Sequence, residues 1–392
     1  MNHSNTILGQ LLSFLPRNKF NQFVGQQEAD RYIKKMTSWS QFVILMYAQA
    51  TGKDSLREIE TGFNTLGSSW YHLGIKSVAR SSISHSNNNR DSNIFEKLFY
   101  ALLKQCQEVV SGDREFKFKN PLYILDSSTI SLCLSLFDWA KYSKTKGALK
   151  LHMILDSTTM LPEIINVTEG KANDIATAKL INIDKLQKGS ILVFDRGYID
   201  YGWWNSLDQK EITFVSRTKK DQNIWIVGQH KKGNMEKGIL ADEIVIFGSY
   251  GAMGKYEKQL RRVRYWDEEK QKEYEYLTNN FDLKASQIAD IYKDRWQVEL
   301  FFKWIKQNLK IKTFLGTSRN AVMTQIWVAM IYYLLLSYIK FQTKFKRSLL
   351  ELTRMIREVL MFKRSLIDLL SLDEKTIYKL KSQELNPQMS FW

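Results

Sequence analysis

Residues 291–307 read IYKDRWQVELFFKWIKQ, and they predict a helix with an unusual division of its surface. Most of the circumference is apolar, whereas a surface helix carries a limited apolar stripe and a broad polar face. The polar positions fall within about 80° of one another at ~100° per residue: Tyr292, Arg295, Glu299, Lys303 and Lys306. We therefore expect a mostly buried helix whose single polar stripe serves a function.

Two apolar strands upstream each carry an aspartate. Asp126 lies in YILDSST, and Asp195 ends the apolar run of LVFDRGY. A carboxylate at the end of a buried strand is costly unless it is paired or bound to a cation. With Glu299, these residues form a trio that suits two Mg²⁺ ions ~3.5–4 Å apart, which activate a nucleophile and stabilise the leaving oxygen of a phosphodiester. Zinc, which prefers nitrogen and sulfur ligands, does not suit this trio.

Each of these residues also has a purely structural interpretation. Asp126 and Asp195 are also typical of turn or helix caps. Glu299 and Arg295 stand four residues apart, the spacing of an ordinary helical ion pair. Taken singly, the structural interpretation leads. Taken together in a basic chain, two strand aspartates and a helix glutamate favour a nuclease-like site.

The pattern of elements predicts an α/β (α+β) fold in five segments. Residues 1–118 read as helical, and SLREIETGF followed by GIKSVARSSISHSNNNR suits either a DNA-binding helix-turn-helix or a plain helical bundle. Residues 119–217 read as three strands, a helix and a further strand. Residues 218–280 predict a β-rich insertion, 281–344 the second part of the core, and 345–392 C-terminal helices.

Composition narrows the class of partner. The 392 residues include 57 Lys and Arg against 41 Asp and Glu, a net charge of +16, which favours nucleic acid over an anionic membrane surface. Two cysteines form neither a disulfide framework nor a zinc motif, and the N-terminus lacks a signal-peptide pattern, so we expect a cytoplasmic protein. The uncharged run 321–339 is long enough to span a membrane, but its isolation and polar residues favour a buried core helix.

The order Tyr292, two residues, Arg295, three residues, Glu299, six residues, Lys306 resembles the Y-(2)-R-(3)-E-(6)-K pattern of insertion sequence 4 family transposases. LDSSTISL and FDRGYIDY are similar to the first and second acidic blocks of that family. SLREIETGF, YHLGI and SNNNRDSNIFEKLFYALL resemble the N-terminal part of its bacterial members. The resemblance implies a DDE transposase with a ribonuclease H-like core and a β-strand insertion before the catalytic glutamate.

The resemblance also implies roles for individual residues. Asp126, Asp195 and Glu299 would be catalytic and ligate two Mg²⁺ ions, with Mn²⁺ as a substitute. Tyr292, Arg295 and Lys306 would hold phosphates at the transposon end.

Other DNA contacts are expected outside that helix. Family members stack a flipped base on an aromatic residue of the insertion; here Tyr274 is the first candidate and Trp266 the second, and a cross-strand packing role is equally open. The further basic candidates are Arg196 beside the second aspartate and Lys144, Lys146 and Lys150 in KYSKTKGALKLH. His152 follows as a group near the scissile phosphate or, alternatively, as a core histidine.

The expected activity is cut-and-paste transposition in the bacterial cytoplasm at the nucleoid. Water attacks the phosphodiester at each transposon end, and the freed 3′-hydroxyl then attacks target DNA. The partners are double-stranded DNA, as terminal inverted repeats and target, and a second copy of the chain in a homodimer; no membrane partner is expected. The alternatives are another ribonuclease H-like nuclease or resolvase, and a domesticated DNA-binding repressor.

Overall fold

The computed structural model describes residues 5–110, 120–143, 146–219, 221–230, 236–248, 250–309 and 314–371. The chain divides into two compact units. One unit comprises residues 1–113 and 304–392, and the other comprises residues 114–303. The division falls within α11 (Trp296–Asn308). Our five-segment domain scheme stays a prediction.

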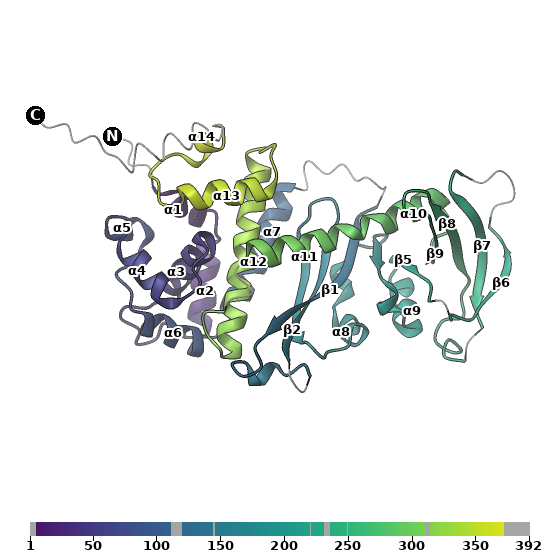
Figure 1. Ribbon diagram of the computed structural model, residues 1–392, viewed down its shortest axis with the longest axis horizontal. Coiled ribbons are helices and arrows are strands. Elements are labelled where there is room, and N and C mark those ends of the chain that lie inside the picture. The colour runs from purple at the N-terminus through teal and green to yellow at the C-terminus, as the bar shows by residue number, and fades with distance from the viewer. Residues whose placement is uncertain are drawn as a thin grey trace, which may run out of the picture. The chain divides into compact units, whose positions relative to one another are not determined.

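Unit 2 is built on one nine-stranded sheet, drawn in blue-green to green in Figure 1. Its strands lie in the order β3-β2-β1-β4-β5-β9-β8-β7-β6. In chain order they are β1 (Leu122–Leu132), β2 (Gly147–Asp156), β3 (Pro162–Glu169), β4 (Ile191–Phe194), β5 (Thr213–Arg217), β6 (Ile224–Gln229), β7 (Ile239–Phe247), β8 (Leu260–Asp267) and β9 (Lys272–Thr278). The expected sequence of three strands, a helix and a strand is confirmed, with α8 (Asp174–Leu180) as the helix.

The first five strands have mixed directions. β1, β2 and β3 pair antiparallel, whereas β4 joins β1 in parallel and β5 joins β4 in parallel. Parallel neighbours require a crossover, and α8 and α9 (Tyr201–Gln209) supply the helices that follow β3 and β4. Three antiparallel strands continued by two parallel ones form the ribonuclease H-like core that the sequence predicts.

The insertion extends the same sheet rather than forming a separate layer. β9 pairs antiparallel with β5, and β8, β7 and β6 follow outward as antiparallel neighbours. The alternating segments of residues 218–280 therefore do form strands, as expected. The outermost strand, β6, leaves Trp225, Ile226 and Val227 exposed on the sheet edge.

Alternation along the strands gives the sheet two buried faces. Leu125, Phe194 and Phe214 belong to one cluster with α9, where the ring centroid of Trp204 lies 4.6 Å from that of Phe214. The alternate residue Val193 is equally buried, and α10 (Ala285–Asp294) contacts β4 and β5. Since successive strand side chains point to opposite faces, α9 and α10 cover different faces.

Unit 1 is helical. Its helices are α1 (Ile7–Ser13), α2 (Arg17–Gln26), α3 (Ser38–Thr51), α4 (Leu56–Asn64), α5 (Trp70–Leu73), α6 (Arg80–Asn89), α7 (Asn93–Val110), α12 (Arg319–Gln342), α13 (Leu349–Val359) and α14 (Leu366–Ser371). α3 begins at the cap Thr37, whose hydroxyl accepts from the N–H of Ser40, and ends at Gly52, whose φ of 73° favours glycine. α5 lies between α4 and α6, the two helices of the proposed helix-turn-helix, and that interpretation stays a prediction.

α12 is the central helix of unit 1. It is long and apolar enough to cross a membrane, yet 89% of its most apolar stretch is buried within the protein. α3, α7 and α13 contact it, and Phe99 of α7 meets Trp327 at a ring distance of 5.4 Å. Packing of this kind is what we expect of a core helix in a large bundle.

Candidate active site

Asp126 lies where β1 changes from buried to partly exposed. The four preceding strand residues, 122–125, are buried, and Asp126 is the first that is not. The backbone N–H of Ser127 donates a hydrogen bond to its carboxylate at 2.7 Å. β1 continues to Leu132, so the carboxylate lies within the strand, at the point where its residues leave the core.

Asp195 directly follows β4. It caps a short 3₁₀ turn, and its carboxylate accepts a hydrogen bond from the N–H of Gly197 at 2.7 Å. Leu125 and Phe194 are register partners in the parallel ladder, so the next residue of each strand is an aspartate. The register of this parallel pair therefore places Asp126 and Asp195 side by side.

Glu299 reaches this edge from α11, and Arg295 joins it to the first aspartate. The Arg295 guanidinium donates to Asp126 Oδ2 at 3.1 Å and to Glu299 Oε1 at 2.5 Å. The four-residue spacing of an ordinary helical ion pair is thus present, but the same arginine also binds a strand residue. Its side chain is only 15% exposed, so solvent screens these contacts little.

The electrostatics of Asp126 report how close the three acids lie. Burial, together with the negative charges of Asp195 and Glu299, raises the pKa of Asp126 to about 6. The Ser127 N–H and the Arg295 guanidinium oppose this shift. One arginine does not compensate three carboxylates, which leaves a site where a cation is favoured.

The opening helix differs from our expectation in two ways. Its first part belongs to α10, which ends at Asp294, and α11 begins at Trp296. The N–H of Arg295 bonds the Tyr292 carbonyl and the N–H of Val298 bonds the Arg295 carbonyl, so three-residue bonds tighten the chain at the junction. The expectation of a mostly buried circumference is wrong for one side, because Trp296 is 58% and Leu300 52% exposed.

Tyr292 sits among aromatic and cationic groups of unit 2. Its ring centroid lies 4.9 Å from that of Tyr276 and 5.7 Å from the Arg295 guanidinium carbon. Burial raises the pKa of Tyr292, and the charges of Arg295 and Arg217 oppose the shift. Lys306 lies farther along α11, in the part of the helix that belongs to unit 1.

Arg217 is a residue that sequence reasoning missed. It ends β5, and its guanidinium carbon lies 4.8 Å from the centroid of Tyr274. Tyr274 in turn stacks on Tyr276 at 6.2 Å, so an aromatic series runs from the insertion to Tyr292. Only the pairing of β5 with both β4 and β9 brings this arginine to the aromatic series, and strand order cannot be read from residues 213–217 alone.

The two aromatic candidates of the insertion lie on opposite faces. Tyr274 pairs with Tyr265 across the β8–β9 ladder, whereas Trp266 pairs with Glu273. Neighbouring strand residues alternate, so Trp266 faces away from the series that reaches Tyr292. The geometry therefore favours Tyr274 over Trp266 near the acids.

The basic residues expected to contact DNA differ in whether they form an ion pair or are exposed. Lys150 is ion-paired, with its Nζ donating to Asp174 at 2.9 Å. Lys146 and Arg196 are exposed, and Lys144 lies outside the described residues.

Asp174 organises a second group beside Asp126, and sequence reasoning overlooked it. The Ser127 hydroxyl donates to Asp174 Oδ1 at 2.7 Å, and Lys150 occupies the other oxygen. His152 pairs with Ser127 across the sheet, lies 3.6 Å from Asp174 and contacts the Thr168 hydroxyl at 2.9 Å. Burial lowers the pKa of His152 to about 4, so it is a neutral core histidine, the second of our two alternatives.

The sequence matches a known family over most of unit 2. The family model described as "Transposase DDE domain" matches residues 117–335, more than half of the chain. The chain belongs to the DDE transposase family. A second model, a domain of unknown function, matches residues 3–76.

Relatives agree with this membership, including its insertion-sequence type. A Sinorhizobium fredii protein called a transposase, y4zB, is 36% identical over 55% of this chain and 60% of its own length. A Geobacillus stearothermophilus protein, called a transposase for insertion sequence element IS5377, is 28% identical over 64% and 65%. A Synechocystis protein, called a transposase for insertion sequence element IS4SA, is 24% identical over 67% and 72%. The chain thus spans 60% to 72% of the length of these relatives.

A solved structure of another transposase also aligns with the chain. The piggyBac transposase synaptic complex with hairpin DNA covers 97% of this chain and 84% of its own, at 8% identity and a TM-score of 0.46.

The donor set fits a hard divalent cation, although its side chains are not arranged as a ready ligand shell. Three carboxylates supply the oxygen ligands that Mg²⁺ prefers. Within the described residues, no three acidic, histidine or cysteine side chains form a group that could hold a metal as they stand. Arg295 contacts one carboxylate oxygen on each of two of the three acids, so it competes with a cation for those oxygens.

Proposed function

We propose that the protein is a DNA transposase that cleaves phosphodiesters at the ends of its element and transfers the 3′-hydroxyl into target DNA. The observation that carries the proposal is the meeting of Asp126, Asp195 and Glu299 at one edge of a ribonuclease H-like sheet. Membership of the DDE transposase family supports the same reaction class.

Asp126, Asp195 and Glu299 are proposed to hold two divalent cations, Mg²⁺ or in its place Mn²⁺. When bound, such ions supply Lewis-acid activation of the attacking oxygen and stabilise the leaving oxygen. The chain's own contribution is to fix the three carboxylates on separate rigid elements. The Gly197 N–H orients the Asp195 carboxylate, and the Ser127 N–H orients that of Asp126.

Arg295 has two roles in this proposal. In the structure it neutralises Asp126 and Glu299, which limits the repulsion among the acids. When bound divalent cations neutralise the Asp126 and Glu299 carboxylates instead, the Arg295 guanidinium is available for a DNA phosphate. Its planar group of N–H donors allows a bidentate contact with that phosphate. Tyr292, Lys306, Arg196 and Lys146 are proposed as further DNA contacts, whereas the ion pair of Lys150 with Asp174 argues for a structural role.

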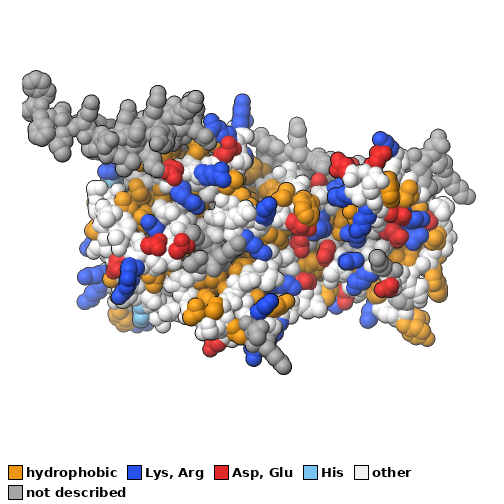
Figure 2. Space-filling model, in the orientation of Figure 1, with side chains coloured by type: hydrophobic (Ala, Val, Ile, Leu, Met, Phe, Trp, Pro, Cys, Tyr) orange, Lys and Arg blue, Asp and Glu red, His pale blue; other side chains and the backbone are white. Residues whose placement is uncertain are grey.

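The proposed substrate is double-stranded DNA, as terminal inverted repeats and as target, at the nucleoid of the bacterial cytoplasm. The net charge of +16 supports a polyanionic partner. Figure 2 shows Lys and Arg side chains spread over the face drawn, with acidic side chains among them. Two ends must be held together for insertion, so we propose a homodimer as the working form.

The test is cleavage of labelled DNA that carries the element's own flanking ends. The protein is incubated with Mg²⁺ or with EDTA, beside Asp195→Ala and the matched surface variant Asp184→Ala. We expect metal-dependent cuts at the element boundary from the unaltered protein and from Asp184→Ala, and none from Asp195→Ala, which still binds.

The other outcomes identify the rivals. Cutting of branched or non-element DNA without preference for the ends would indicate a resolvase-like nuclease. End binding without cutting by the unaltered protein, in both Mg²⁺ and Mn²⁺, would indicate a repressor.

A further inference from the structure

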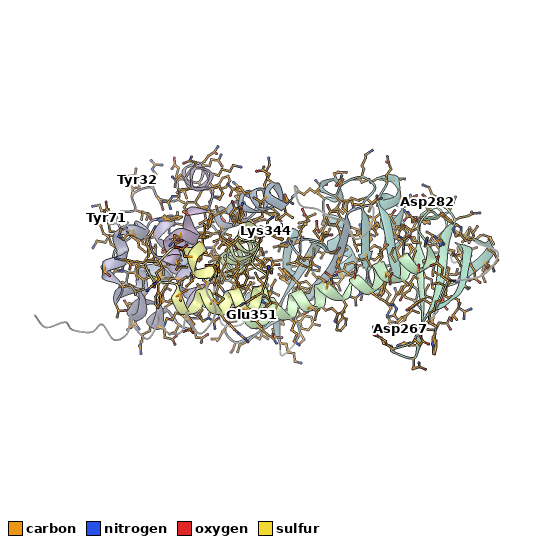
Figure 3. The ribbon with its side chains drawn as sticks, turned by 90° about the horizontal axis from the view of Figure 1, so that it is seen from above. Tyr32, Tyr71, Asp267, Asp282, Lys344 and Glu351 are labelled. Atoms are coloured by element: carbon orange, nitrogen blue, oxygen red, sulfur yellow. The ribbon has the colours of Figure 1, made fainter. Side chains whose placement is uncertain are left out.

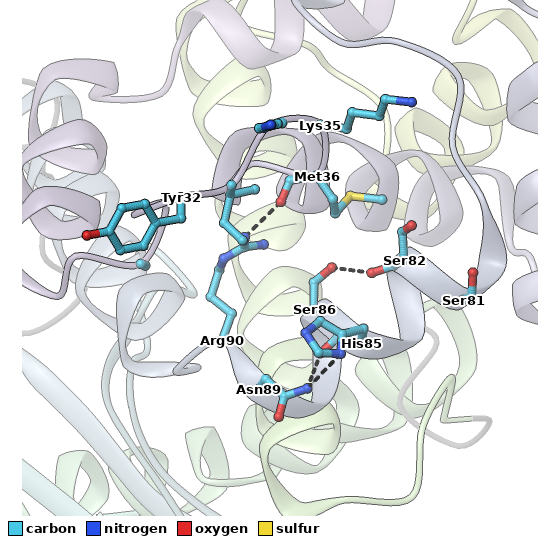
Figure 4. Close-up of a pocket in the computed structure, with 12 residues that line it drawn as sticks. Tyr32, Lys35, Met36, Ser81, Ser82, His85, Ser86, Asn89 and Arg90 are labelled. Carbon is cyan, nitrogen blue, oxygen red and sulfur yellow. Dashed lines mark hydrogen bonds between the residues drawn. The ribbon is translucent and has the colours of Figure 1, made fainter.

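Unit 1 contains a hollow that has no role in the proposed cleavage and strand transfer. Its volume is about 820 Å³, within the range of pockets that hold small ligands. It opens between the segment that follows α2 and the outer side of α6, as the close-up in Figure 4 shows. The residues that line it include Tyr32, Lys34, Lys35, Ser82, Asn89 and Arg90.

The lining is cationic and rich in neutral hydrogen-bonding groups. Lys34, Lys35 and Arg90 bring positive charge, and none of the lining residues is a carboxylate. Serine hydroxyls and the Asn89 amide from α6 add donors and acceptors. Asp30 is the nearby acid: its Oδ1 accepts from the N–H and hydroxyl of Ser38 at 2.7 and 2.9 Å and lies 3.3 Å from the Arg90 guanidinium. Arg90 is therefore paired, and Lys34 and Lys35 give the lining its net positive charge. The hollow therefore favours an anionic ligand that also offers neutral acceptors.

Arg90 makes the hollow a built feature rather than a surface irregularity. Its side chain is 6% exposed, and its guanidinium donates to the Met36 carbonyl and the Gln41 side chain, each at 2.8 Å. The bond to Met36 fastens the 27–37 segment to α6 and its neighbours (Figure 4), and the bond to Gln41 ties Arg90 to α3. Its buried Nε has no hydrogen-bond partner in the described part of the chain. The remaining guanidinium nitrogens are bonded, so Arg90 holds this wall of the hollow in one arrangement.

Tyr32 supplies a flat apolar surface at the rim. It is 86% exposed and lies at the surface of unit 1 in Figure 3. Its φ of 61° places a non-glycine residue in the left-handed region, which bulky residues rarely adopt. An exposed ring beside a cationic hollow is the pairing by which proteins bind a nucleotide base and its phosphate.

We propose that this hollow binds one or two nucleotides of a DNA strand, with phosphate against Lys34 and Lys35 and a base on Tyr32. The inference rests on the proposed function for its choice of DNA, but it concerns a site separate from the carboxylates. A duplex is too wide to enter a hollow of this size, so single-stranded or locally unpaired DNA is the ligand.

The test measures binding of a fluorescent oligodeoxynucleotide to the full chain by anisotropy, across a salt series. The main variant is K34E/K35E, and the matched control K344E/K346E makes the same charge change elsewhere in the unit. We expect K34E/K35E to weaken single-strand binding about tenfold or more and to reduce the slope of log K against log salt by roughly 1.4. The control should weaken binding less than threefold.

Two further variants test the hollow without changing the net charge of the protein. Ser82→Phe fills the hollow and Tyr32→Ala removes the ring, and each should lower single-strand affinity at least fivefold with a smaller effect on duplex. Circular dichroism and thermal unfolding verify that each variant is folded.

Equal losses in K34E/K35E and K344E/K346E, or unchanged binding in Ser82→Phe, would overturn the proposal. Tighter binding of RNA or of anionic phospholipid vesicles through the same residues would also overturn it. The readout needs no cleavage and works with the Asp195→Ala protein, so failure here is distinguishable from failure of the transposase proposal.

Discussion

The guanidinium of Arg295 donates a hydrogen bond of 3.1 Å to the carboxylate of Asp126, 169 positions earlier in the chain. The same side chain binds Glu299 at 2.5 Å, so one cation joins a strand acid and a helix acid. The pairing makes Arg295 both a structural counter-ion and a competitor for any cation that the acids bind.

Arg295→Met tests this double role. Without its guanidinium, Asp126 and Glu299 repel each other in a partly buried site, and we expect the free energy of unfolding to fall by about 1–3 kcal/mol in EDTA. Mg²⁺ should raise the melting temperature of the variant more than that of the unaltered protein. The control Arg264→Met breaks a more exposed pair with Glu273 and should cost under about 1 kcal/mol. Equal costs would contradict the counter-ion role.

Asp126 should make stability fall as pH rises. Its folded pKa of about 6 is above that of an unfolded aspartate, so the native state binds the proton more tightly between about pH 4 and 6. Across that window its contribution to the free energy of unfolding should fall by up to about 3 kcal/mol in the absence of metal. Asp126→Asn removes this slope and should be the more stable protein at pH 7. Urea unfolding of both proteins from pH 4 to 7 in EDTA measures it, and parallel profiles would show the shift to be absent.

Gly197 should be required for the orientation of Asp195. A Cβ at this position would meet Asp195 Oδ1 at 2.9 Å, so Gly197→Ala displaces the carboxylate that the Gly197 N–H now holds. We expect a folded protein whose cleavage rate falls about tenfold or more, since small misplacements of reacting groups are costly. Gly202→Ala is the matched control, because its Cβ would lie an ordinary 3.5 Å from the nearest atom. A normal rate in Gly197→Ala would refute the requirement.

Lys150 and Lys146 should separate stability from DNA affinity. Lys150→Met leaves Asp174 without its cation and should lower the free energy of unfolding by about 1–2 kcal/mol. Lys146→Met should leave stability within about 0.5 kcal/mol and weaken DNA binding instead. A double-mutant cycle of Lys150→Met with Asp174→Asn should give a coupling of about 0.5–2 kcal/mol. A coupling near zero would contradict the structural role of the Lys150–Asp174 ion pair, and Lys150 would again be a candidate DNA contact.

The sequence predicts the local pattern of this fold well. Asp126 and Asp195 each follow an unbroken apolar run, so a carboxylate directly after buried strand residues is readable without a structure, although β1 continues past Asp126 to Leu132. The Arg295–Glu299 contact follows from helical spacing. Arg217 and Asp174 were not predictable, because their contacts depend on which strands become neighbours. The junction at Arg295 was also missed, since no glycine or proline marks it.

The continuous sheet has a consequence for synthesis on the ribosome. β5 finds its second neighbour in β9 only after the whole insertion has been made, and Glu299 emerges later still. Contacts between residues so far apart in the sequence form slowly. The chain loses the entropy of closing the loop before strand pairing stabilises the closed state. A nascent chain therefore exposes the two strand aspartates without Arg295 or the helix acid, and the proposed nuclease chemistry appears only when the last part of the sheet and α11 have folded.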